Sequence, residues 1–251
     1  MPQKTRKILF WSLFSVFIVL AIIIPAYQAG YRIDQNFNIA QVGGIFLALP
    51  ENGNQIYLDG KLEKETGYFS ASFYIENLKP KNYSVIVAKD GYWPWTKQLE
   101  IKENMVTEAK PFLLKKNIEG KPVENNEEIM NEFLNRDSFA LKTNNKNNIE
   151  IRKENGKIIA RWKKGPPLPY YFSKEEQIIF QTINEIKNFE FFPKRSDLVV
   201  LALRNGIFAL EIDGRGLRNF QPIYKGFDPD FVLIENKFYI RDQNAVFEIK
   251  L

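Results

Sequence analysis

Four neighbouring residues have the types and spacing that ligand binding requires: Tyr92, Trp93, Pro94 and Trp95. In an extended segment the side chains of Trp93 and Trp95 project from the same face. Paired indoles can stack on sugar rings or hold a peptide, so Tyr92, Trp93 and Trp95 are the candidate ligand-binding residues. The alternative, which we favour, places the indoles in the core or at an edge marked by Pro94, because large aromatic side chains are buried more often than exposed.

A second group of interest is the carboxylate pair Asp228 and Asp230, which brackets Pro229. Glycoside hydrolysis needs only two carboxyl groups about 5–9 Å apart. Asp-Pro-Asp is, however, typical of a turn in which the carboxylates accept backbone hydrogen bonds. We therefore expect the chain not to be an enzyme.

Other catalytic classes lack their essential residues. The sequence contains no cysteine and no histidine, which excludes disulfides, thiol chemistry, the usual zinc sites and every histidine-based mechanism. No loop has the spacing of a calcium site. The basic run at 214–218 lacks the strand-to-helix context of a phosphate-binding loop. We expect neither a cofactor nor a metal.

The formal net charge of +5 does not indicate a nucleic-acid partner. Much of the excess comes from Lys4, Arg6 and Lys7, which precede an apolar segment, and the rest of the chain is nearly neutral. Interspersed charges of both signs offer no stripe that tracks phosphates. We therefore expect no binding of nucleic acid.

Residues 8–27 form an uncharged, apolar run long enough to cross a bilayer of about 30 Å. A cleaved signal peptide, the alternative, has an apolar core of about 7–15 residues and a small-residue cleavage site, which the exit from this run fits poorly. The basic residues before the run place the N-terminus in the cytoplasm and the C-terminal ectodomain outside. We expect residues 1–30 to be a cytoplasmic stub and a retained single-pass anchor in the cell membrane.

Residues 40–115 contain strand-sized runs separated by turns, which predicts a small antiparallel β-sandwich. The turn pairs are Asn52-Gly53, Asp59-Gly60, Lys81-Asn82 and Asp90-Gly91, each of which tolerates positive φ.

This region resembles the PEGA domain, a small β-sandwich of bacterial and archaeal surface proteins. The resemblance is carried by Gly44-Ile45, Pro50-Glu51, Ile-Tyr-Leu-Asp-Gly at 56–60, Leu-Lys-Pro-Lys-Asn-Tyr-Ser-Val at 78–85 and Gly91-Tyr92. The sequence departs from the family pattern at Asn52-Gly53-Asn54 and Lys81-Asn82, where asparagine can serve the same left-handed turns as glycine. The resemblance implies a structural or binding module of the envelope and brings no catalytic residues.

Residues 116–148 read as a linker with one short amphipathic helix, which begins near Glu127. Residues 149–251 are rich in hairpins, such as the one around Asn205-Gly206. Two stretches in this module, which begin at 189 and 227, resemble β-propeller blades. Only two or three blades fit, so the module is either an open fragment or completes its sheet with another chain. Residues 173–187 are ambiguous between helix and strand, and we favour a strand.

The predicted fold is mainly β, with an N-terminal transmembrane helix, a PEGA-like sandwich and a blade-like module. The predicted function is a non-catalytic, membrane-anchored envelope protein that binds polysaccharide or peptidoglycan. The alternative is an assembly protein that pairs with a protein partner through an exposed edge strand of residues 149–251. A hydrolase that uses carboxylates alone is the weakest hypothesis.

Overall fold

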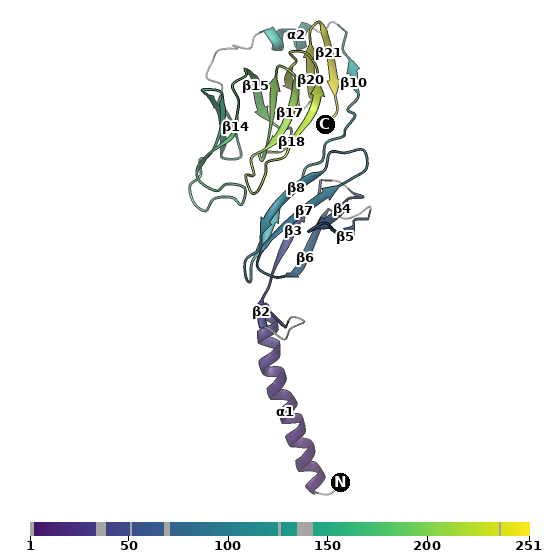
Figure 1. The fold of residues 1–251 in the computed structure, drawn as a ribbon, viewed down its shortest axis with the longest axis vertical. Helices are drawn as coiled ribbons and strands as arrows, with labels where there is room; N and C mark the ends of the chain where they lie inside the picture. The colour runs from purple at the N-terminus through teal and green to yellow at the C-terminus, as the bar shows by residue number, and fades with distance from the viewer. Residues whose placement is uncertain are drawn as a thin grey trace.

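The computed structural model describes residues 3–33, 39–50, 52–67, 71–124, 127–134, 143–235 and 237–251. Figure 1 shows a long helix, a small sandwich of strands and a larger β module, one after another along the long axis. The chain is mainly β with an N-terminal apolar helix, as the sequence predicted.

Helix α1 (Gln3–Gln28) contains the apolar run at 8–27 and buries none of its residues against the rest of the protein. Among the described residues it is the one helix whose length and composition allow it to cross a membrane, with a mean hydropathy of 2.7. It is followed at once by a short antiparallel hairpin of β1 (Tyr31–Ile33) and β2 (Ile39–Gln41).

The next module is a sandwich of two sheets, which Figure 1 shows in blue above the helix. The three-stranded sheet has the order β6-β3-β9 and contains β3 (Gly43–Ala48), β6 (Ser72–Leu78) and β9 (Val106–Ala109). The four-stranded sheet has the order β5-β4-β7-β8 and contains β4 (Gln55–Leu58), β5 (Lys61–Glu65), β7 (Asn82–Ala88) and β8 (Trp95–Glu100). Strand β8 buries alternate residues, the pattern of a strand with one face in a core.

The C-terminal module consists of three four-stranded antiparallel sheets, here called blades 1, 2 and 3. Blade 1 contains β11 (Thr143–Lys146), β12 (Ile149–Glu154), β13 (Lys157–Trp162) and β14 (Glu176–Gln181) in sequence order. Blade 2 contains β15 (Ile186–Phe191), β16 (Leu198–Leu203), β17 (Gly206–Glu211) and β18 (Phe220–Lys225), also in sequence order. The ambiguous segment forms strand β14, as we predicted.

Blade 3 takes one strand from a distant part of the sequence. It contains β19 (Asp230–Ile234), β20 (Lys237–Asp242) and β21 (Ala245–Ile249), and β10 (Gly120–Pro122) pairs with β21 as its outer strand. This pairing joins the segment that leaves the sandwich to the last strand of the chain, and Figure 1 shows β10 beside β21 at the right of the upper module.

The two end faces of the described blades differ, because one is covered by a helix and the other is charged. Helix α2 (Glu127–Leu134) packs Ile129 and Phe133 against blade 3. On the outer face of blade 1, Arg152 donates to Glu176 at 2.9 Å and lies 3.8 Å from Glu150. A charged face of this kind is poorly suited to packing against a further apolar blade.

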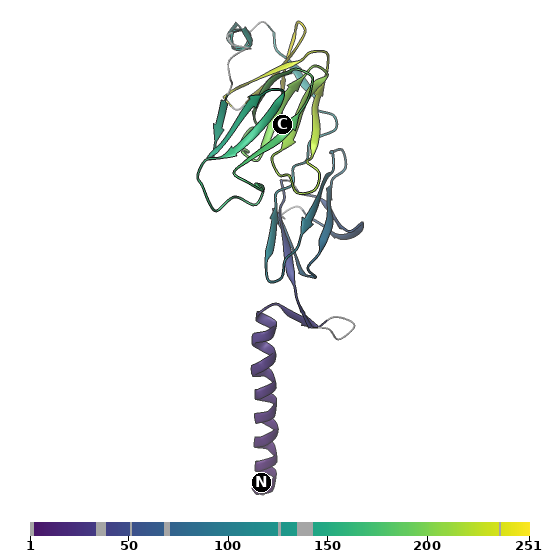
Figure 2. The same ribbon diagram turned by 60° about the vertical axis from the view of Figure 1, so that its left-hand side comes forward.

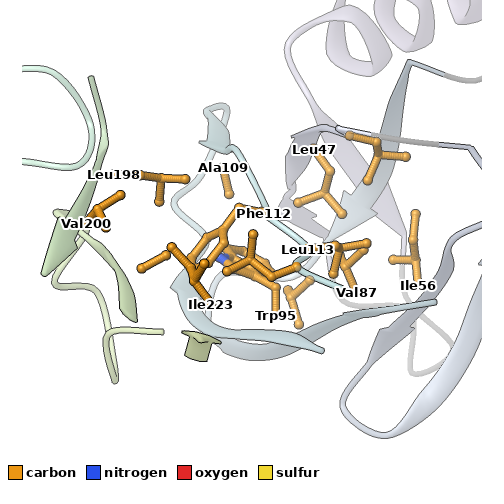
Figure 3. Close-up of a cluster of buried hydrophobic side chains, with 14 of the residues drawn as sticks. Leu47, Ile56, Val87, Trp95, Ala109, Phe112, Leu113, Leu198, Val200 and Ile223 are labelled. Carbon is orange, nitrogen blue, oxygen red and sulfur yellow. The ribbon is translucent and has the colours of Figure 1, made fainter. Parts of the chain in front are cut away.

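The sandwich and blade 2 share one hydrophobic core. Figure 3 shows Trp95 and Phe112 of the sandwich side, with Leu198, Val200 and Ile223 of blade 2 beside them. All five residues are at most 6% exposed. The two modules therefore bury apolar surface against each other and form a continuous unit.

Candidate functional site

Trp95, the first residue of β8, is 1% exposed and lies inside the shared core. Its indole Nε1 donates to Oε2 of Glu211 at 3.0 Å, across the boundary between the sandwich and blade 2. A buried indole usually finds a partner for its N–H in this way. The ring has no open face for stacking on a sugar, so Trp95 acts in this structure as a junction residue.

Tyr92 and Trp93 are only partly buried, at the rim of the same core. The backbone N–H of Trp93 donates to the carbonyl of Leu114 at 2.8 Å. Lys116 Nζ lies 5.7 Å from the Trp93 ring centroid, and Lys89 Nζ lies 4.8 Å from that of Tyr92. The structure thus brings the three predicted aromatic residues to one core but leaves only Tyr92 and Trp93 within reach of solvent.

The most deeply buried charges in the described chain form an ion pair between the modules, Lys97 with Glu211. Lys97 is 1% exposed and also donates to the carbonyls of Asp213 at 2.8 Å and Leu217 at 3.2 Å. All three ammonium donors are therefore satisfied. Asn219 donates to Glu211 from its backbone N–H and from its amide, each at 2.7 Å.

Burial raises the pKa of Glu211 above its usual value, and Lys97 and Asn219 oppose that shift. Lys97, Trp95 and Asn219 all bind the carboxylate, which is almost fully buried. The arrangement has the chemistry of a structural lock between two sheets. It lacks the solvent-accessible acid or base that a hydrolase needs.

The carboxylates of Asp228 and Asp230 bind neighbouring protein groups, and only Asp230 is shown to accept the backbone hydrogen bond expected of a turn. Asp228 pairs with Lys187 at 3.0 Å, whereas Asp230 Oδ1 accepts from the Asn188 amide at 3.0 Å and from the Phe231 backbone N–H at 2.7 Å. Among the described residues no group of three or more acidic side chains is placed to hold a metal ion.

The basic run at 214–218 also belongs to the junction. Arg215 donates to both carboxylate oxygens of Asp213, at 3.0 and 2.7 Å, and to the backbone carbonyl of Glu108 in the sandwich at 2.8 Å. The guanidinium group is thus engaged with protein oxygens, and the loop ties blade 2 to β9.

The edge of blade 1 is a surface open to strand pairing. The sheet order ends at β14, whose sequence Glu-Gln-Ile-Ile-Phe-Gln carries a charge only at its first residue. Ile178 in the middle of the strand is 45% exposed. Three other outer strands carry devices known to block pairing: four of the five residues of β5 are charged, and β18 and β10 contain Pro222 and Pro122. The apolar outer strand β19 packs against α2.

A stack of phenylalanine rings lies next to this edge. Phe180 of β14 stacks on Phe220 of blade 2 with ring centroids 5.5 Å apart, and Phe220 stacks on Phe208 at 4.7 Å. Phe220 is 39% exposed. Figure 1 labels β14 and β18 in the upper module. The edge and the rings together form the β14 surface, defined by Ile178, Phe180 and Phe220.

The comparisons with known proteins identify one domain. The PEGA domain model matches residues 48–117, which run from the end of β3 to just beyond β9. A solved structure of a proposed carbohydrate-binding protein from Bacteroides uniformis is 12% identical; the likeness covers 72% of this chain and 96% of that one, with a TM-score of 0.24. So low a score carries no argument about function. No curated protein matches the chain. The chain therefore contains a PEGA domain, which forms the sandwich between the N-terminal helix and the three blades.

Proposed function

We propose that this chain is a non-catalytic, membrane-tethered binding protein of the cell surface. The support for the tether is α1, which is apolar along residues 8–27 and unburied by the rest of the protein. Its flanking charges, Lys4, Arg6 and Lys7, favour a cytoplasmic N-terminus. The PEGA domain and the blades then lie outside, where the sandwich holds the blades away from the membrane.

The binding surface in this proposal is the β14 surface, and the partner is a protein that adds an extended segment to the edge of blade 1. One observation carries the choice: β14 ends its sheet with an apolar, nearly uncharged edge, whereas β5, β10 and β18 carry charges or proline and the apolar β19 packs against α2. Backbone hydrogen bonds provide affinity in strand addition, and neighbouring side-chain pockets provide specificity. Phe180 and Phe220 supply the apolar contacts beside the added strand.

The test places a photoreactive amino acid at Ile178 in the full chain expressed in its membrane. The matched control carries the same amino acid at Ile183, which is 104% exposed and follows β14 by two residues. We expect a discrete protein adduct from position 178 and several-fold less from position 183. A second labelling experiment places the photoreactive amino acid at Phe220. A charge in the middle of an edge strand opposes pairing, so the adduct from position 220 should disappear when Ile178→Asp is added and persist when Ile183→Asp is added.

Two results would contradict the proposal. Equal labelling from positions 178 and 183 would show that no partner selects the edge, and an adduct that survives Ile178→Asp would show that the edge does not hold it. An adduct of twice the 29.4 kDa chain mass would identify the partner as a second copy.

A second candidate function is the binding of envelope polysaccharide or peptidoglycan at Tyr92 and Trp93. The observation that favours it is the partial exposure of both rings, with Trp93 Nε1 buried and without a hydrogen-bond partner among the described residues. We expect a saturable change in tryptophan fluorescence on titration with cell-wall polysaccharide. The change should be lost in Trp93→Phe and retained in Trp162→Phe, and an unchanged response in Trp93→Phe would refute this candidate.

A further inference from the structure

The hairpin that follows the helix presents an exposed apolar face directly beyond the apolar segment of α1. Tyr31 and Ile33 project from one face of β1, and Ile39 lies opposite Ile33 in the register with β2. Tyr31 is 42% exposed, and Ile33 and Ile39 are each 69% exposed. Two paired isoleucines this exposed are unusual on a protein surface in contact with water.

Arg32, on the opposite face of β1, fixes the position of this hairpin. Its Nη1 donates to the carbonyls of Tyr27 at 2.8 Å and Tyr31 at 2.9 Å, and its guanidinium carbon lies 3.6 Å from the Tyr27 ring centroid. Its Nε donates to Oδ1 of Asn77 in β6 at 2.8 Å. One side chain thus contacts the helix end, the hairpin and the PEGA domain.

Backbone contacts close the same joint. Val42 N–H donates to the carbonyl of Gly30 at 3.0 Å, and Asn104 N–H donates to the carbonyl of Val42 at 3.0 Å. Gly30 adopts a φ of +81°, and a Cβ there would lie 3.2 Å from Asn104 Oδ1, so glycine suits this close approach. Figure 2 shows β1 and β2 leaving the helix sideways instead of continuing its axis.

We propose that Tyr31, Ile33 and Ile39, the membrane-facing hairpin surface, insert into the interfacial layer of the bilayer that α1 crosses. Only Ala29 and Gly30 separate the helix from β1, so Ile33 lies within about 18 Å of the helix end. The partner is the lipid surface because this covalent connection brings the hairpin to the bilayer boundary. Tyrosine with neighbouring apolar side chains is the composition that interfaces favour.

The inference rests on the proposed anchor role of α1 and adds a consequence for the ectodomain. Inserted on one side of the helix, the hairpin fixes the tilt of the ectodomain, and the Arg32 contacts transmit this orientation to the PEGA domain. The β14 surface is thereby held at a defined distance from the membrane.

The experiment uses single cysteines in the full chain, which has no native cysteine. A polarity-sensitive nitrobenzoxadiazole label is attached at Ile39→Cys, with Ile183→Cys as the matched exposed control. The protein is reconstituted in phosphatidylcholine vesicles that contain headgroup spin-labelled lipid. We expect the emission from position 39 to be shifted to the blue and quenched several-fold more strongly than that from position 183. A third variant, Val16→Cys, reports on α1 through quenching by acyl-chain spin-labelled lipid.

The variants separate failure of this inference from failure of the anchor. Strong quenching at position 16 with no excess quenching at position 39 over position 183 overturns the inference and leaves the anchor intact. No quenching at any of the three positions overturns both. A blue shift at position 39 that depends on protein concentration and not on spin-labelled lipid also overturns the inference, because it places the hairpin against a second copy.

Discussion

The ion pair between Lys97 and Glu211 locks the PEGA domain to blade 2. Lys97→Met removes the ammonium group from a site that is 1% exposed and leaves the Glu211 carboxylate without its countercharge. Breaking a buried pair in this way typically costs about 3–5 kcal/mol of unfolding free energy. We therefore expect Lys97→Met to lower the stability of the full chain by about that amount at pH 8.

The loss should depend on pH, with a sign fixed by Glu211. Burial already raises the pKa of Glu211 above 4.5, its ordinary value, and Lys97 opposes that shift, so removal of Lys97 raises the pKa further. The folded variant then binds a proton at a pH where the unfolded chain has lost it. This proton therefore stabilises the folded variant. Its contribution to the unfolding free energy is fully present below about pH 4.5 and is lost as the pH rises through the folded pKa of Glu211, by at most about 1.4 kcal/mol per pH unit.

The assay is urea unfolding in detergent micelles, followed by circular dichroism and by tryptophan fluorescence, at pH 5 and pH 8. The matched control is the double variant Lys97→Met, Glu211→Leu, in which both charges are replaced by apolar groups; it should recover most of the loss. The reasoning is refuted if the single variant loses less than about 1 kcal/mol at pH 8, the value of an exposed pair, or if the double variant is as unstable as the single one.

Two further predictions concern the close packing of β3 and the hydrogen bonding of a tyrosine. Gly44→Ala places a Cβ 2.6 Å from Tyr74 Oη and should lower the unfolding free energy, measured in urea, by about 1–3 kcal/mol. The control Gly67→Ala, with no described atom within 4 Å of the new Cβ, should change it by less than about 0.5 kcal/mol. Equal effects of the two variants would contradict the packing argument. Burial, and then the hydrogen bond to Asp242 at 2.9 Å, raises the pKa of Tyr224. The contribution of Tyr224 to stability is therefore present below about pH 10 and is lost as the pH rises through its folded-state pKa. Between about pH 9 and 11 the temperature of thermal unfolding should fall less in Tyr224→Phe than in the parent protein. Equal slopes would exclude Tyr224 as the cause of the alkaline decline.

The sequence contained enough local information to predict the helix and the hairpins. The apolar run at 8–27 matches α1, and Asn205-Gly206 lies at the tight turn between β16 and β17. These features depend on residues close together in the chain, where turn chemistry and hydrophobic periodicity act directly. Residues 173–187 are ambiguous between helix and strand from the sequence, and the strand is favoured because a blade requires one there; the structure forms β14 in this segment.

Long-range pairings could not be predicted in the same way. Strand β10 is Gly-Lys-Pro, a sequence with no strand preference, and it forms a strand only because β21 offers it a free edge. The partner of Lys97 lies 114 residues away. A signal was nevertheless present, since Lys97 lies between Trp95 and Leu99 on the face of β8 that alternation predicts to be buried. A lysine at such a position indicates a buried acidic partner.

The measurement that tests the central claim most directly is the accessibility of single cysteines to a membrane-impermeant maleimide in intact cells. The central claim is that α1 tethers a surface-exposed PEGA domain and its blades to the membrane. It predicts that Ile183→Cys is labelled in intact cells and stays in the membrane fraction, whereas Thr5→Cys is labelled only after the cells are broken open. Labelling of Thr5→Cys and not of Ile183→Cys in intact cells, or release of the labelled chain into the medium, would contradict it.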